Sequence, residues 1–212
     1  MATIDIKHMK LFNNQVKMNS KTLMSSASDA KIQTKRKPKV SLIIGGTKSG
    51  KSSYALKYTL GFGNTSKERA VITTSKDRTK EIKEECKLLE INKENSVSIF
   101  EEEENISNII KAIPHSAQII LIDNISVWIG NLIKDKKDCI SLSAELEKLI
   151  SETNKDIILI SNIVGLGIIP DSYFDREFRD ASGSFNQELA TIANNVILMV
   201  AGIPVAIKGE LL

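Results

Sequence analysis

From residue 40 onward, short aliphatic runs alternate with longer stretches in which apolar residues recur every three or four positions. The short runs predict buried β-strands, and the longer stretches predict amphipathic α-helices. Strands are expected at residues 40–44, 70–74, 97–100, 118–122, 157–160 and 196–200, with a short last strand at 205–207. Helices are expected at about residues 51–60, 76–91, 106–113 and 143–152, in the segment that ends near 134, and between the strands at 157–160 and 196–200. This alternation is typical of an α/β fold with a mainly parallel sheet that helices cover on both faces.

The first 39 residues differ from the rest of the chain in charge. They carry nine Lys or Arg against two Asp or Glu, a net charge of +7, whereas residues 40–212 carry 20 against 24, a net of −4. We therefore expect a basic, disordered leader over residues 1–39, followed by one P-loop domain over 40–212. A transit peptide and a nucleic-acid-binding arm are alternatives for the leader. Its single arginine disfavours the first, and the scarcity of aromatic residues among the charges, where Phe12 is the only one, disfavours the second.

The overall composition is that of an ordinary soluble protein, with 42% hydrophobic and 26% charged residues. No apolar run reaches the roughly 20 residues needed to span a bilayer, and the N-terminus lacks the apolar core of a secretory signal. The two cysteines, Cys86 and Cys139, form neither a disulfide framework nor a metal-ligand cluster. We expect a cytoplasmic protein with no membrane span and no nucleic-acid partner.

A phosphate-binding loop follows the first predicted strand. The pattern G-x-x-x-x-G-K-[ST] is matched in full by Gly45, Gly46, Thr47, Lys48, Ser49, Gly50, Lys51 and Ser52. Its glycines let backbone N–H groups surround a β-phosphate at a helix N-terminus, where the helix dipole also favours anions. Lys51 is expected to reach the β- and γ-phosphates of ATP or GTP, and the Ser52 hydroxyl to bind Mg²⁺. The loop predicts nucleotide-dependent phosphoryl transfer.

A carboxylate at the end of a neighbouring strand normally completes such a site by holding the shell of the Mg²⁺ ion. Asp123 ends the predicted strand at 118–122 and fits this role. Its alternative role is the N-cap of the helix that follows, and the two roles are compatible. Lys51 and Asp123 are the predicted catalytic residues, with Ser52 and Asp123 as Mg²⁺ ligands.

Beyond these motifs, the sequence resembles the bifunctional adenosylcobinamide kinase/adenosylcobinamide-phosphate guanylyltransferase family of cobalamin biosynthesis. The resemblance covers nearly all of residues 40–208, and its C-terminal part is the most specific. It is carried by residues 43–52, 73–75, 121–126, 131–132, 161–162, 164–170, 178–180, 183–187 and 202–204.

The resemblance implies a RecA-like P-loop fold and a homo-oligomer, with a trimer as the expected state. It also implies two reactions, which are phosphorylation of adenosylcobinamide and transfer of GMP from GTP to the resulting phosphate. In the family a histidine carries the GMP covalently. By the same resemblance, Thr73, Thr74 and Ser75 contact the nucleotide, and Glu101 or a near neighbour holds the guanosine.

The expected histidine is missing from this chain. It should lie in the helix after Ser75, yet residues 81–91 contain none. The two histidines are His8, in the leader, and His115, which we interpret as a loop residue after a proline. Cys86 falls near the expected position, but its apolar neighbours at helical spacing indicate a core face, and a buried thiol is inert. Phosphoryl transfer depends mainly on the P-loop, which is complete in this chain. We therefore expect the missing histidine to affect the kinase activity less than guanylyl transfer.

Two further positions depart from the family pattern, which usually has a glutamate where Ile163 stands and an aspartate near Asn194. We expect these changes to affect the substrate or lid side of the site. The alternatives to a cobinamide kinase are a nucleotide-binding regulatory protein and a kinase for another small hydroxyl-bearing substrate, each without guanylyl transfer.

Overall fold

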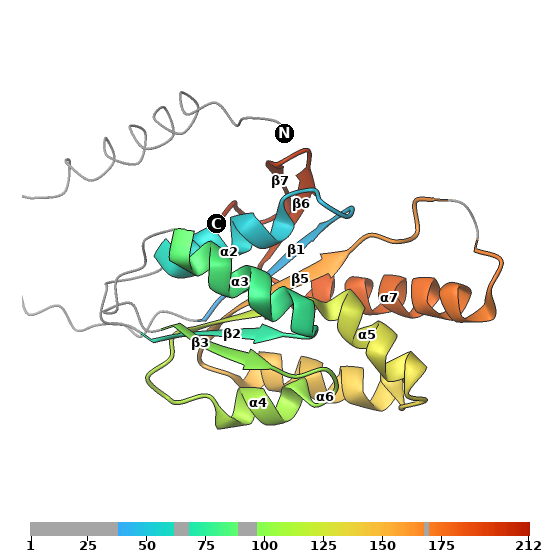
Figure 1. Ribbon diagram of the computed structural model, residues 1–212, viewed down its shortest axis with the longest axis horizontal. Helices are drawn as coiled ribbons and strands as arrows, with labels where there is room; N and C mark the ends of the chain where they lie inside the picture. Colours follow the sequence, from blue (N-terminus) through green and yellow to red (C-terminus); the bar gives the residue numbers. More distant parts are fainter. Residues whose placement is uncertain (1–37, 62–67, 89–96, 168–169) are drawn as a thin grey trace, which may run out of the picture. The chain divides into compact units, whose positions relative to one another are not determined.

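The structure is a computed structural model, and it describes residues 38–61, 68–88, 97–167 and 170–212 (Figure 1). The predicted leader lies almost entirely outside these residues. The described strands are β1 (Val40–Gly45), β2 (Arg69–Thr73), β3 (Val97–Glu101), β4 (Ile119–Asp123), β5 (Asp156–Asn162), β6 (Asn195–Val200) and β7 (Ile203–Lys208). The described helices are α2 (Lys51–Gly61), α3 (Lys76–Leu88), α4 (Ile106–Ala112), α5 (Ile125–Lys134), α6 (Cys139–Glu152) and α7 (Tyr173–Ile192).

The strands form one sheet in the order β3-β2-β4-β5-β1-β6-β7. Every neighbouring pair is parallel except β6 with β7, which is antiparallel. Strand β1 therefore lies inside the sheet between β5 and β6, and β5 separates it from β4. The predicted α/β fold, a RecA-like P-loop fold with a mainly parallel sheet, is confirmed by this arrangement.

Helices cover both faces of the sheet because successive side chains of each strand point to opposite faces. Leu42 and Ile122 belong to the core cluster beneath α4, α5, α6 and α7, whereas Ile43 and Leu121 belong to the cluster beneath α2 and α3. Figure 1 shows the two groups of helices on opposite sides of the strands. All four of these side chains are at most 1% exposed, which explains why the strands are continuously aliphatic.

Most predicted boundaries lie within one residue of those in the structure, but those of β5, α6 and β7 were wrong. Strand β5 spans Asp156–Asn162 where 157–160 was expected. Helix α6 begins at Cys139 and not at 143, because the Asp138 carboxylate caps it by accepting from the N–H groups of Ile140 and Ser141. The last strand is also longer than expected and spans Ile203–Lys208, since it pairs with β6 along most of its length. The predicted end of α3, at 89–91, lies outside the described residues. Among the helices that are described, none is long and apolar enough to cross a membrane.

Candidate nucleotide-binding site

The P-loop connects the end of β1 to the start of α2 at the carboxyl edge of the sheet, where ligands of open α/β sheets bind. Two of its glycines are required by the surroundings. A Cβ atom on Gly45 would lie 2.5 Å from the carbonyl oxygen of Met199. Gly50 has a φ of +97°, and a Cβ there would lie 3.2 Å from the Cα of Gly202. At Gly45 and Gly50 the surroundings therefore have no room for a side chain, and the backbone of the loop can approach a bound phosphate with its N–H groups.

Lys51 is the first residue of α2, and its side chain turns back over the loop. Its ammonium group donates to the carbonyl oxygens of Gly45 and Gly46, over 2.9 and 2.6 Å. Burial lowers the pKa of Lys51, while the nearby Asp123 carboxylate acts in the opposite direction. In this state the loop carbonyls accept the hydrogen bonds of the ammonium group and hold Lys51 at the centre of the loop. A phosphate that binds to Lys51 must replace these carbonyl oxygens as the acceptor.

A cavity of about 320 Å³ lies over this loop. It is lined by Lys48, Ser49, Gly50, Lys51, Ser52, Ser53, Arg78 and Glu81. Its volume is at the lower end of the range for ligand pockets, and every residue that lines it is charged, a serine or a glycine. These properties suit a phosphate chain better than an apolar ligand.

Asp123 ends β4 and lies beside the loop, with its side chain 3% exposed. Burial raises the pKa of Asp123, whereas the Arg78 guanidinium and a hydrogen bond with Ser52 lower it. The structure thus brings together the two residues predicted to bind Mg²⁺. The alternative role of Asp123 as a helix N-cap is wrong, because Asn124 caps α5 by accepting from the N–H of Val127.

The hydroxyl groups of Thr73 and Thr74 are engaged in the protein itself. The Thr73 hydroxyl lies 2.7 Å from that of Thr79, and Thr74 exchanges hydrogen bonds with the backbone N–H and carbonyl of Asn124. Both threonines are buried, Ser75 is half-buried, and none of the three lines the phosphate cavity. Thr73 thus joins the end of β2 to α3, and Thr74 joins it to the residue after β4. A nucleotide contact by any of the three stays a prediction.

Glu101 is the last residue of β3, which is an edge strand of the sheet, and its side chain is exposed. Three strands separate β3 from β1, which places their strand ends about 19 Å apart at a spacing of about 4.8 Å per strand. The structure does not bring Glu101 together with the phosphate cavity. Its contact with guanosine also stays a prediction.

Arg78 and Glu81 line the cavity from α3, and neither was predicted as a site residue from the sequence. Arg78 Nε donates to Asp123 Oδ2 over 2.7 Å, and its Nη1 lies 2.7 Å from Glu81 and 3.0 Å from Glu85. The three α3 residues share one helix face because they are spaced three and four positions apart. That spacing was visible in the sequence. A charged helix face usually points to solvent, however, so the spacing did not predict a contact between Arg78 and Asp123.

The structure supports the interpretation of Cys86 as a residue on the core face of α3. This cysteine is partly buried and packs against the core cluster beneath α2 and α3. Burial and the neighbouring Glu85 raise the pKa of its thiol, while Arg78 lowers it. His115 is exposed in the turn before β4, at the opposite end of that strand from Asp123. His115 is therefore a loop residue, as predicted, and His8 lies outside the described residues.

The two positions that lack the usual carboxylate lie in different places. The N–H of Ile163 donates to the carbonyl of Gly45, next to the P-loop. Asn194 instead accepts from and donates to the backbone of Val40, at the amino end of β1. Asn194 therefore lies at the opposite end of β1 from the P-loop, and an effect of these two changes on the substrate or lid side stays a prediction.

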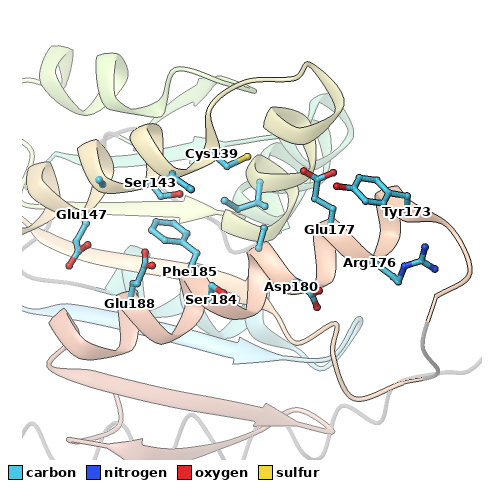
Figure 2. A pocket seen from close by; sticks show the side chains of 14 residues that line it. Cys139, Ser143, Glu147, Tyr173, Arg176, Glu177, Asp180, Ser184, Phe185 and Glu188 are labelled. Carbon is cyan, nitrogen blue, oxygen red and sulfur yellow. The ribbon is translucent and has the colours of Figure 1, made fainter.

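A larger cavity of about 850 Å³ lies between α5, α6 and α7 (Figure 2). Phe185 and the carboxylates of Glu147, Glu177 and Glu188 are among its lining. None of the residues predicted for the nucleotide site lines it. The phosphate cavity and this groove are separate features.

Comparison with known proteins gives a consistent result. A family model described as "Cobinamide kinase / cobinamide phosphate guanyltransferase" matches residues 41–207. The chain is 30% identical over 182 residues to the "Bifunctional adenosylcobalamin biosynthesis protein CobU" of Escherichia coli (strain K12), covering 79% of this chain and 98% of the relative. It is 34% identical over 98 residues to the corresponding CobP protein of Pseudomonas aeruginosa, covering 45% and 56%. A KaiC-like protein from Pyrococcus horikoshii OT3 is 19% identical, with 76% and 71% covered and a TM-score of 0.48.

Proposed function

Because the chain belongs to the cobinamide kinase / cobinamide phosphate guanyltransferase family, we propose that it is a transferase of cobalamin biosynthesis that phosphorylates adenosylcobinamide. The observation that carries this proposal is one constellation at the carboxyl edge of the sheet. Lys51 lies over the P-loop, and Asp123 lies beside Ser52. The family match favours this enzyme over a regulatory protein that only binds nucleotide.

In this reaction the hydroxyl oxygen of adenosylcobinamide forms a bond to the γ-phosphorus of ATP or GTP. The bond from that phosphorus to the bridging oxygen breaks, the nucleoside diphosphate leaves, and the hydroxyl proton is released. Positioning and charge stabilisation supply most of the catalysis in such transfers. The backbone N–H groups of the loop hold the β-phosphate, and Lys51 exchanges its contacts with Gly45 and Gly46 for phosphate oxygens.

The residues beside the loop fit a magnesium ion. Ser52 supplies a hydroxyl oxygen and Asp123 a carboxylate, and oxygen ligands are those that Mg²⁺ prefers. When bound, the ion neutralises charge on the β- and γ-phosphates. Ser52 would bind it directly, and Asp123 would bind it directly or through water.

Transfer of GMP from GTP to adenosylcobinamide phosphate is the second activity that membership in the family implies. Imidazole suits a covalent intermediate of this reaction because it can attack phosphorus and later leave near neutral pH. Residues 81–91 contain no histidine, and Cys86 is partly buried with a raised thiol pKa. A second activity of this chain therefore uses a route other than a histidine in that helix.

A homo-oligomer, with a trimer as the expected state, is part of the proposal, as is a cytoplasmic location. Edge strand β7 supports self-association because Ile203, Val205 and Ile207 are each about half exposed or more, at 64%, 48% and 59%. An uncovered apolar edge strand is normally protected in a native protein. The mass measured by light scattering during gel filtration tests the oligomer.

The kinase activity is tested by incubating the purified protein and Mg²⁺ with adenosylcobinamide and ATP or GTP labelled at the γ-phosphate. Label in the corrinoid supports the proposal, and bound nucleotide without labelled corrinoid contradicts it. Unlabelled adenosylcobinamide phosphate and GTP labelled at the α-phosphate test the second activity in parallel. Acid-labile label on the protein would reveal a phosphoramidate, formed by a nitrogen nucleophile other than a histidine of helix α3.

A further inference from the structure

The guanidinium of Arg78 lies where the Mg²⁺ side of the site meets the phosphate cavity. Its Nε donates to a carboxylate oxygen of Asp123, and the side chain also lines the cavity over the P-loop. Arg78 thus contacts the carboxylate that is predicted to hold the metal shell and faces the space that is predicted to hold phosphates.

One nitrogen of this guanidinium is uncommitted. Nε pairs with Asp123, and Nη1 pairs with Glu81 and Glu85. Nη2 is buried and has no hydrogen-bond partner among the described residues. A buried donor without a partner is costly, and a charged one more so, which makes Nη2 available to an incoming acceptor. Guanidinium groups bind phosphate oxygens well because their planar N–H groups can donate in pairs.

We propose that Arg78 is a second cationic ligand of the nucleotide phosphates, in addition to Lys51. In the nucleotide-free protein the guanidinium neutralises Asp123. When nucleotide and Mg²⁺ bind, Asp123 turns to the metal shell, and Nε and Nη2 of Arg78 donate to phosphate oxygens. Glu81 and Glu85 retain Nη1, so the side chain stays anchored to its own helix during this exchange. This inference rests on the proposed function in that it requires a nucleotide in the P-loop.

A purely structural role is the competing explanation, in which Arg78 only neutralises a buried carboxylate. The two explanations differ once that carboxylate has lost its charge. In the Asp123→Asn variant a phosphate-binding Arg78 is released toward the cavity and contributes to nucleotide affinity. An Arg78 with only a structural role no longer has a carboxylate to neutralise and contributes nothing to that affinity. Removing both groups, in Arg78→Ala/Asp123→Asn, also avoids leaving a buried carboxylate unpaired, which could otherwise prevent folding.

The test measures the affinity of ATP and GTP carrying a fluorescent group on the ribose, without metal in EDTA, for the wild type and the variants. We expect Asp123→Asn to bind more tightly than the wild type in EDTA. We expect Arg78→Ala/Asp123→Asn to bind about tenfold or more weakly than Asp123→Asn, the loss typical of one charge-assisted hydrogen bond. Lys80→Ala/Asp123→Asn removes an exposed charge from the same helix and should stay within about twofold of Asp123→Asn.

Equal affinities for Asp123→Asn and Arg78→Ala/Asp123→Asn would overturn the inference and leave the proposed function intact. An equal loss in the Lys80 and Arg78 double variants would also overturn it, because a general charge effect would then suffice. If the wild type bound neither nucleotide, with or without Mg²⁺, the proposed function itself would fail. Circular dichroism and the emission of Trp128 confirm that each variant is folded before its affinity is compared.

Discussion

The backbone N–H of Gly202 donates a hydrogen bond to the carbonyl of Ser49 over 2.9 Å. This contact joins the turn between β6 and β7 to the P-loop, although the two segments are far apart in the sequence. The Cα of Gly202 also fills the space next to Gly50, where a side chain would not fit. The conformation of the phosphate-binding loop therefore depends on a turn near the edge of the sheet.

Replacing Gly202 with alanine should weaken both folding and nucleotide binding. Gly202 has a φ of +81°, a conformation that costs a residue with a Cβ about 1–2 kcal/mol. We expect the free energy of unfolding to fall by about that amount, measured in urea by Trp128 emission. We also expect the dissociation constant for ATP or GTP to rise about fivefold, the equivalent of ~1 kcal/mol. Gly61→Ala, at a position with open space and no positive φ, is the control. If the two variants behaved alike, the turn would not support the loop.

Replacing Lys51 with alanine should abolish phosphoryl transfer. Lys51 supplies the charge that the loop directs at the phosphates, and loss of one such group typically lowers the rate by about 10²–10³-fold. Initial rates of label transfer from γ-labelled ATP or GTP to adenosylcobinamide measure the effect. Lys57→Ala removes an exposed lysine from the same helix and should retain the wild-type rate. Comparable rates for the two variants would refute the assignment of the loop.

Replacing Asn131 with alanine should loosen the edge of the sheet beside the site. The Asn131 amide donates to the backbone carbonyls of Thr74 and Glu103, both over 3.1 Å, and so joins α5 to the ends of β2 and β3. Unsatisfied groups of this kind cost about 1–3 kcal/mol when buried. We expect the free energy of unfolding to fall by about 1–2 kcal/mol and the KM for nucleotide to rise. Asn108→Ala, on the exposed face of α4, should change neither quantity measurably. An unchanged KM in Asn131→Ala would show that the hydrogen bonds of Asn131 do not affect nucleotide binding.

Much of the fold could be predicted because its signals are local. Strands with buried side chains on both faces are continuously aliphatic, and the P-loop pattern is contiguous, so β1 and the loop were placed almost to the residue. The start of α6 was missed although Asp138 is a good N-cap and Cys139, Leu142 and Leu146 already recur at helical spacing. At α5 the sequence analysis considered Asp123 as the cap, and the hydrogen bond to Val127 identifies the adjacent Asn124 instead.

The rest of the site depends on strand order and on distant pairing, which the sequence does not display. Glu101 follows a predicted strand just as Asp123 does, but its strand lies at the far side of the sheet. Arg78 resembles any arginine on a charged helix face until α3 packs over β2 and β3, next to β4 in the sheet, and brings it to Asp123. Gly202 contacts the P-loop only because β6 pairs with β1. In each case the missing information is which elements are neighbours.

The last prediction concerns Cys86 and its thiol. Burial and Glu85 raise its pKa, so it keeps its proton at pH values where an ordinary cysteine becomes a thiolate. In a Cys139→Ser protein, where Cys86 is the remaining thiol, we expect slow reaction with iodoacetamide at pH 8, accelerating up to a pH above 9.

The pKa of Cys86 in the folded protein lies above that in the unfolded chain, so the stability that this thiol contributes is lost as the pH rises above about 9. Cys86→Ser should therefore show a shallower loss of stability at alkaline pH and an unchanged rate of phosphoryl transfer. Fast alkylation at pH 7, together with loss of guanylyl transfer in Cys86→Ser, would identify Cys86 as a nucleophile instead.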